Sequence, residues 1–232
     1  MTTHKTAARI FGIFFIIAFA AYGTGSGLVD SIANAPGNLA NVYANKTQLI
    51  TGAILMALVH TFVNIGLAVI MLPILKPYNK NLAYGYFSAA IVATVVLVFG
   101  AIYLLLLIPL SDEFVKAGSA ITPYFETLSI VLKKGGYFSY QIAMAIWGLG
   151  GLMFCYLLNL SRLVPRPIAL WGFIGYIIFI SGTIFELYGF GHNIGLLLDI
   201  PGGVFEIFLS VWLIVKGFNP SAFASTPAKT AD

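Results

Sequence analysis

The chain has 232 residues, of which 59% are hydrophobic and only 9% are charged, and its formal net charge is +4. A soluble domain has roughly a quarter of its residues charged, and a soluble fold of this length has too little interior for so many apolar side chains. The composition therefore excludes a soluble globular protein and predicts an all-α, polytopic membrane protein.

Six apolar stretches are each long enough to cross a hydrocarbon core about 30 Å thick, which takes about 20 helical residues. They cover residues 10–29, 49–75, 82–110, 137–160, 168–188 and 194–215. The polar links between them are short. We therefore expect a single integral membrane domain over residues 1–232, with six transmembrane helices.

The first stretch follows a basic start and contains an Ala-Phe-Ala triplet at residues 18–20 that resembles a signal-peptide cleavage site. The apolar run continues well beyond this triplet, so we expect a retained helix. Gly23 and Gly27, spaced four apart near its end, predict close packing against a second helix.

The link at residues 30–47 is rich in asparagine, with Asn34, Asn38, Asn41 and Asn45 at spacings of four, three and four. On a helix beginning near Pro36 these amides would form one polar stripe. We favour a short interfacial helix with its amides in water; the alternative is an amide-lined lid over a cavity.

In the other long link, residues 111–136, the part from 124 to 134 is typical of an amphipathic interfacial segment.

Lysine and arginine are distributed unevenly between the links. Eight of the twelve fall on one predicted side: Lys5, Arg9, Lys76, Lys80, Arg162, Arg166, Lys216 and Lys229. Because positive residues stay cytoplasmic, both termini are predicted to face the cytoplasm. The basic side suits anionic headgroups. It lacks the interleaved aromatic residues of a nucleic-acid surface, so no nucleic-acid partner is expected.

Several kinds of cofactor chemistry are disfavoured by the residue inventory. Cys155 is the only cysteine, which excludes a disulfide within the chain and a cysteine-based metal site. Three histidines are too few for a histidine-clustered di-iron site, and no phosphate-binding loop, nucleophile elbow or dinucleotide fingerprint is present. His60, Glu186 and Glu206 are suitable zinc ligands, but the sequence does not bring them together. The sequence thus requires no cofactor and predicts no metal.

Polar residues at membrane depth are expensive and by default suggest a functional site. In the second stretch His60 and Asn64 lie one turn apart, on one helical face. They are suited to binding a headgroup, a proton or a cofactor. The alternative is an interhelical hydrogen bond that stabilises the bundle by about 0.6–2 kcal/mol. We expect both side chains to face the interior, with His60 hydrogen-bonded to another polar side chain.

The last stretch carries Asp199 and Glu206 around a Pro-Gly-Gly sequence at residues 201–203. A helix broken there would resemble the ion and substrate sites of transporters. Alternatively, Asp199 caps a helix that begins at the next residue. Glu206 is about two turns deeper, so capping does not explain it. Glu186, near the end of the fifth stretch, is a candidate for the mouth of the same cavity.

Several strings resemble a known family. Ala8-Arg9-Ile10-Phe11-Gly12 opens the first stretch, residues 72–79 read LPILKPYN, residues 159–168 read NLSRLVPRPI, and the last stretch closes with WLIVKG at 212–217. In this order and spacing they resemble the bacterial six-helix membrane family known as domain of unknown function 4386. The resemblance extends from about residue 8 to residue 218. It implies six spans and a prokaryotic inner membrane, and it supplies no established activity.

Two functions fit these features, and we favour the first. The protein would bind or move a small or lipidic ligand in a cavity of the bundle, using candidates among His60, Asn64, Glu206, Asp199 and Glu186. Alternatively, it is a small intramembrane enzyme acting on a lipid or isoprenoid, with His60 and Glu206 as acid and base within reach of one reacting group. A third reading is a structural subunit of a membrane complex. The bilayer is the expected partner, and a homo-oligomer is compatible with the sequence.

Overall fold

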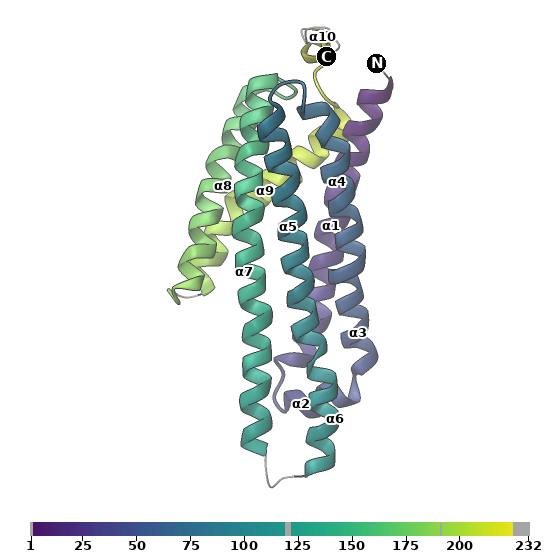
Figure 1. The fold of residues 1–232 in the computed structure, drawn as a ribbon, viewed down its shortest axis with the longest axis vertical. Helices are drawn as coiled ribbons and strands as arrows, with labels where there is room; N and C mark the ends of the chain where they lie inside the picture. The colour runs from purple at the N-terminus through teal and green to yellow at the C-terminus, as the bar shows by residue number, and fades with distance from the viewer. Residues whose placement is uncertain (1, 119–121, 191, 225–232) are drawn as a thin grey trace. The chain divides into compact units, whose positions relative to one another are not determined.

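The computed structural model describes residues 2–118, 122–190 and 192–224, and every regular element in these ranges is helical (Figure 1). Six segments are long and apolar enough to cross a membrane. They are His4–Ala33, Lys46–Leu75, Lys80–Ala117, Pro123–Ser161, Arg166–Leu187 and Leu197–Val215. The predicted all-α membrane fold with six spanning helices is confirmed. Most of these segments are longer than predicted, because polar residues at their ends continue the helices.

The contacts divide the chain into two compact units. The first unit comprises residues up to Ile16, Asn64–Val92 and the chain from Met144 onward, and the second comprises Ile17–Val63 and Ala93–Ala143. Four long helices contribute residues to both units: α1 (Thr2–Ala33), α4 (His60–Leu75), α5 (Lys80–Leu105) and α7 (Thr122–Ser161). The expectation of a single domain stays a prediction.

The first unit also contains α8 (Arg166–Leu187), α9 (His192–Val215) and the short α10 (Pro220–Ala224). Its core is fully buried and apolar, with Phe11, Leu67, Leu157, Phe205 and Leu213 among its members. Helices α8 and α9 run side by side as a hairpin (Figure 1). A Cβ added to Gly175 of α8 would lie 3.2 Å from the carbonyl oxygen of Pro201, so glycine permits this close approach.

The second unit contains α2 (Asn38–Ala44), α3 (Lys46–Ile54), the π-helical turn η1 (Leu55–Val59) and α6 (Leu107–Ala117). Helix α2 lies beside α6 (Figure 1). The core of this unit is separate from that of the first and includes Val29, Leu49 and Leu107. Elements α3, η1 and α4 follow one another without a gap, so the second span is one continuous helical segment with a π-helical turn inside it.

The asparagine-rich link forms the expected short helix, α2, and its amides bond mostly to nearby chain. The Asn41 amide donates to the Pro36 carbonyl oxygen at 2.8 Å, and that of Asn45 donates to the Asn41 carbonyl oxygen at 3.0 Å. Asn38 donates to the hydroxyl of the buried Ser129 on α7 at 2.7 Å. The stripe therefore ties α2 into the second unit, and the lid remains a hypothesis.

Gly23 and Gly27 were predicted to support close helix packing, and this prediction is wrong. A Cβ added to Gly23 or Gly27 would meet nothing within 4 Å. Gly25 lies on the buried face instead, and a Cβ added to it would be 2.7 Å from the Gly52 carbonyl oxygen. A Cβ added to Gly52 would likewise be 2.7 Å from the Gly25 carbonyl oxygen. A shift of two residues turns the helix by about 200°, so the i, i+4 pair identified the opposite face.

Residues 124–134, expected to form an interfacial amphipathic segment, are the first turns of α7, and their place at the interface stays a prediction. Phe125 is buried and its ring meets that of Phe114 on α6 edge-on, with centroids 5.9 Å apart. The apolar face thus packs against a helix of its own unit. At 40 residues, α7 is about 60 Å long and exceeds a hydrocarbon core of about 30 Å.

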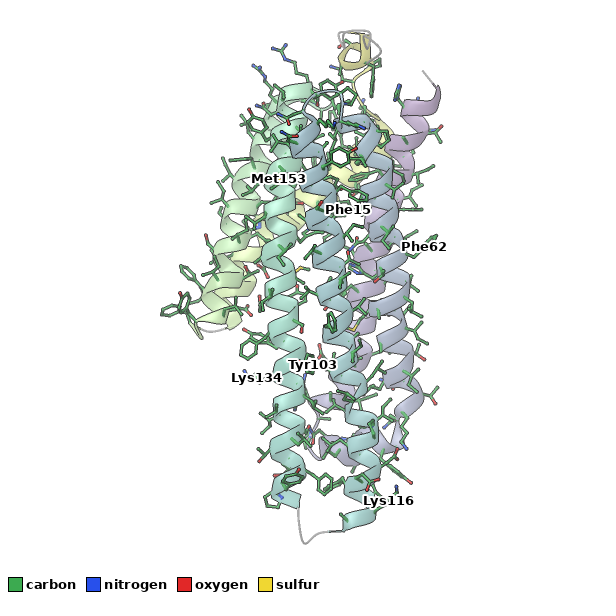
Figure 2. The ribbon with its side chains drawn as sticks, viewed as in Figure 1. Phe15, Phe62, Tyr103, Lys116, Lys134 and Met153 are labelled. Carbon is green, nitrogen blue, oxygen red and sulfur yellow. The ribbon has the colours of Figure 1, made fainter. Side chains whose placement is uncertain are left out.

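Large apolar side chains lie on the outside of the spanning helices. Phe62 on α4, labelled in Figure 2, has 71% of its surface exposed. Exposed leucine, isoleucine, valine and phenylalanine recur along the other spanning segments. Apolar exposure on this scale is expected of surfaces that face lipid, and it agrees with the multi-pass assignment.

Candidate functional site

The first candidate site is centred on the carboxylate of Glu206, near the middle of α9. The side chain is 8% exposed. Its Oε1 accepts two hydrogen bonds, one from Trp147 Nε1 at 2.8 Å and one from the Tyr176 hydroxyl at 2.5 Å. Within the described residues no hydrogen bond reaches the other oxygen, Oε2. One oxygen is thus held by two aromatic donors while the other is left available.

Three helices of the first unit bring these groups together. Trp147 comes from α7, Tyr176 from α8 and Glu206 from α9. The Tyr176 ring lies against Gly151, where an added Cβ would be 2.4 Å from the ring. Glycine at position 151 therefore makes room for the tyrosine, and the ring can reach the carboxylate. Buried tyrosine and tryptophan usually satisfy their polar atoms in this way.

A small cavity lies beside the two donors. Its volume is about 10 Å³, and its walls include Phe15, Tyr86, Phe154 and the donors Trp147 and Tyr176. This is room for about one water molecule. The lining is otherwise aromatic or small and does not include Glu206, the carboxylate to which both donors bond. Such rings present negative faces to which a cation is attracted.

The second candidate, His60, belongs to the second unit. It is 8% exposed, and the ring of Tyr22 meets it edge-on with centroids 5.1 Å apart. Tyr22 in turn packs against Tyr140 at 5.7 Å. The π-helical turn at Leu55–Val59 ends immediately before the histidine. Such turns are frequent at functional sites. Sequence reasoning missed this one, because the five residues contain neither glycine nor proline.

Asn64, the predicted companion of His60, is also buried but falls in the first unit. The hydrogen bond expected from His60 to a polar side chain stays a prediction, and so does its pairing with Glu206 as acid and base. In the described chain no three histidine, cysteine, aspartate or glutamate residues gather as a metal site.

Glu186 on α8 and Asp199 on α9 each face the other helix of the hairpin rather than the Glu206 carboxylate. A Cβ added to Gly195 would lie 2.1 Å from Glu186 Oε1, and one added to Gly182 would lie 3.2 Å from Asp199 Oδ1. Each carboxylate therefore occupies space over a glycine of the facing helix. The Glu186 carboxylate explains the glycine at position 195, whereas at Gly182 an added Cβ would first meet Leu198 Cβ, at 2.9 Å.

Both predictions for the start of the last span are wrong. Helix α9 begins at His192 and runs through Pro201 to Val215, so it is neither broken at residues 201–203 nor capped by Asp199. Proline removes one backbone hydrogen bond, but neighbouring helices can compensate within a membrane. Gly202 serves helix packing, since an added Cβ would lie 3.3 Å from Phe179 Cβ, whereas a Cβ added to Gly203 would meet nothing within 4 Å.

Sequence reasoning also missed Trp147 and Tyr176. Both carry a hydrogen-bond donor at mid-span, close in sequence to Gly148 and Gly175 respectively. A donor-bearing aromatic residue at that depth needs an acceptor, and this signal was present in the sequence. The partner was not, because the relative register of three separate helices decides which acceptor each residue meets.

Six apolar spanning helices and a buried carboxylate define a multi-pass α-helical membrane protein. Residues 10–217 match the family model described as "Domain of unknown function (DUF4386)". The chain belongs to this family, as its motifs predicted. No curated protein and no solved structure matches it.

Proposed function

We propose that the protein binds, and moves within the membrane, a small or lipidic ligand held at Glu206. The observation that carries the proposal is the half-occupied carboxylate, with Oε1 held by two donors and Oε2 bonded to none of the described residues. A purely structural carboxylate would be expected to use both oxygens, because each hydrogen bond to a charged group stabilises the fold. A ligand that donates to Oε2 would supply the hydrogen bond that this oxygen does not receive from the described residues.

The chemistry of the site selects the ligand. An oxygen of a carboxylate accepts hydrogen bonds or pairs with a positive charge, so the ligand carries a hydroxyl group, a protonated amine or a small cation. Glu206 does not line the small cavity beside its two donors, but the rings of Phe15, Tyr86 and Phe154 in that cavity favour a cationic or apolar body next to Trp147 and Tyr176. An anionic ligand would be repelled by Glu206.

The size of the cavity sets a condition on binding. About 10 Å³ accepts a water or a small ion, so a larger ligand whose body enters this cavity requires the aromatic side chains to change rotamer. Binding and release would then be coupled to movement of the ring walls. This coupling is what a protein that moves its ligand requires.

We further propose that the protein resides in a prokaryotic inner membrane with both termini in the cytoplasm. The excess of lysine and arginine in alternate links supports this orientation. A contact within the first unit also supports it, since the His4 ring stacks on that of Phe223 with centroids 3.8 Å apart. Two ends that touch lie on the same side, which an even number of spans requires.

Trp147 offers a direct test, because it donates to the same carboxylate oxygen. In a Trp171→Phe/Trp212→Phe background it is the only tryptophan of the chain. The protein is titrated in detergent with four probes of equal tail length: dodecylamine, dodecanol, dodecanoate and dodecane. We expect a saturable change in emission with the amine and the alcohol only.

Two variants in the same background complete the test. The change should disappear in Glu206→Leu and persist in Glu113→Gln, which neutralises an exposed carboxylate on α6. An equal response to all four tails, or an undiminished response in Glu206→Leu, would show that the probes partition nonspecifically and that the proposal is wrong.

A further inference from the structure

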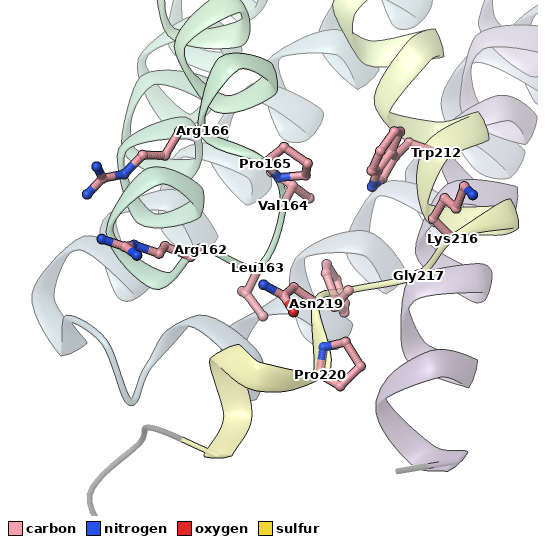
Figure 3. Close-up of a pocket in the computed structure, with 11 residues that line it drawn as sticks. Arg162, Leu163, Val164, Pro165, Arg166, Trp212, Lys216, Gly217, Asn219 and Pro220 are labelled. Atoms are coloured by element: carbon pink, nitrogen blue, oxygen red, sulfur yellow. The ribbon is translucent and has the colours of Figure 1, made fainter.

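A second, larger pocket lies in the first unit where three spanning helices end. It is formed by the loop between α7 and α8 and by the C-terminal end of α9, and its volume is about 500 Å³. Figure 3 shows Arg162 and Arg166 beside each other, with both guanidinium groups extending away from Trp212 and Lys216, which lie across the pocket.

The pocket is cationic and lacks a balancing acid. Three of its lining residues are positively charged and none is acidic. The carboxylates of the first unit that the structure describes are Glu186, Asp199 and Glu206. The last of these precedes Lys216 by ten residues, about 15 Å along the helix. Both ion pairs found in the described chain belong to the second unit. The three cations are therefore available to an anion from outside.

Arg162 stands at a backbone position that favours glycine. Its φ is +55°, and it is the only non-glycine residue of the described chain with positive φ. The other four residues with positive φ are glycines. A side chain in this conformation is strained, and such strain is concentrated at functional sites. An arginine kept in a strained position, beside a second arginine, indicates a use for its guanidinium group.

The floor of the pocket is apolar and fixed. Leu163, Val164 and Phe218 are buried beneath the charged rim. The backbone N–H of Asn219 donates to the Leu163 carbonyl oxygen at 2.8 Å, which fastens the segment after α9 to the α7–α8 loop. A cationic rim over an apolar floor, at the ends of spanning helices, suits a ligand with an anionic head and an apolar body.

We propose that this pocket binds a phosphate group, supplied by a phospholipid headgroup or by a soluble phosphate ester. Paired guanidinium groups suit phosphate because each can present two parallel N–H donors to its oxygens. Lys216 adds a positive charge to the opposite rim, and Trp212 offers an aromatic face to the non-polar part of the ligand. The site is independent of Glu206, which lies deeper in α9.

The binding of three probes to the purified protein in neutral detergent tests this proposal. Native mass spectrometry and calorimetry would compare dioleoylphosphatidylglycerol, glycerol 3-phosphate and dioleoylglycerol, which has the same tails without phosphate. Arg162→Gln/Arg166→Gln is the test variant. Lys76→Gln/Lys80→Gln is its matched control, because it removes two charges from another link of the same unit.

At least one phosphate-bearing probe should bind, and dioleoylglycerol should not. The test variant should lose about tenfold or more in affinity, and the control should change by less than about threefold, because only the arginines line the pocket. Binding of phosphatidylglycerol alone identifies a headgroup site, whereas competition by glycerol 3-phosphate identifies a soluble ligand. Equal losses in both variants, or binding of neither phosphate, would overturn the proposal.

Arg162→Gly separates function from folding. Glycine relieves the strain at φ +55° while it removes one guanidinium group. The variant should therefore melt at the wild-type temperature or higher and still bind the phosphate probe more weakly. Unchanged phosphate binding in this variant would show that Arg162 does not contact the phosphate and only contributes positive charge to the α7–α8 link, which would contradict its role in the site.

Discussion

Glu206 and its two donors join three helices of the first unit at one carboxylate oxygen. A hydrogen bond to a charged group contributes about 1.5–3 kcal/mol, and losing one partner leaves a buried group unsatisfied. Two such bonds meet at one oxygen of Glu206. Each aromatic donor therefore contributes measurably to the free energy of unfolding and also positions the carboxylate.

Tyr176→Phe should lower the free energy of unfolding by about 1–3 kcal/mol, because it removes only the hydroxyl that donates to Glu206. The shift can be measured as a fall in melting temperature in detergent. Tyr188→Phe is the control: this tyrosine follows the same helix and is 77% exposed. If both variants melted alike, the hydrogen bond would have no role in stability.

At the scale of the helices, the crossing of α1 and α3 makes a second prediction. Gly25→Ala should destabilise the protein by about 1–3 kcal/mol, because the added methyl group meets the Gly52 carbonyl oxygen. Gly23→Ala and Gly27→Ala are matched controls on the same helix, with no atom within 4 Å. Alanine is the better helix former, so these two should be neutral or mildly stabilising.

Thermal unfolding of the three alanine variants in one detergent distinguishes the face of α1 that carries Gly25 from the face that carries Gly23 and Gly27. A loss of stability in Gly23→Ala or Gly27→Ala equal to that in Gly25→Ala would contradict the close approach of α1 and α3 at Gly25 and Gly52. The comparison holds residue type, helix and substitution constant, so only the facing atoms differ.

The existence of the spans could be predicted from the sequence, and their details could not. The length of each apolar run settles whether it crosses a bilayer. The continuity of α9 through Pro201 depends on neighbours that compensate for a missing hydrogen bond, which no local pattern reveals. The meeting of Trp147 with Glu206 depends on the register between α7 and α9. Glu206 itself was predictable, since a carboxylate at that depth is rare in any span.

At the scale of the whole chain, orientation follows from the charge of the links. In a Cys155→Ala background, Ala40→Cys should react with a membrane-impermeant maleimide on intact spheroplasts, because residue 40 follows the first span. Lys80→Cys should react only after lysis, because it follows the second. Labelling of both positions from the same side would contradict the six-span topology.

The central claim is that Glu206 holds a ligand within the membrane, and the molecules that copurify with the protein test it most directly. The wild type, Glu206→Leu and the surface control Glu113→Gln are extracted into polymer nanodiscs from one bacterial host, and their bound small molecules are compared by mass spectrometry. We predict a hydroxyl- or amine-bearing molecule retained near stoichiometry by the wild type and by Glu113→Gln, and reduced about tenfold or more in Glu206→Leu. Identical sets of molecules in all three preparations, with all three proteins folded, would contradict the claim.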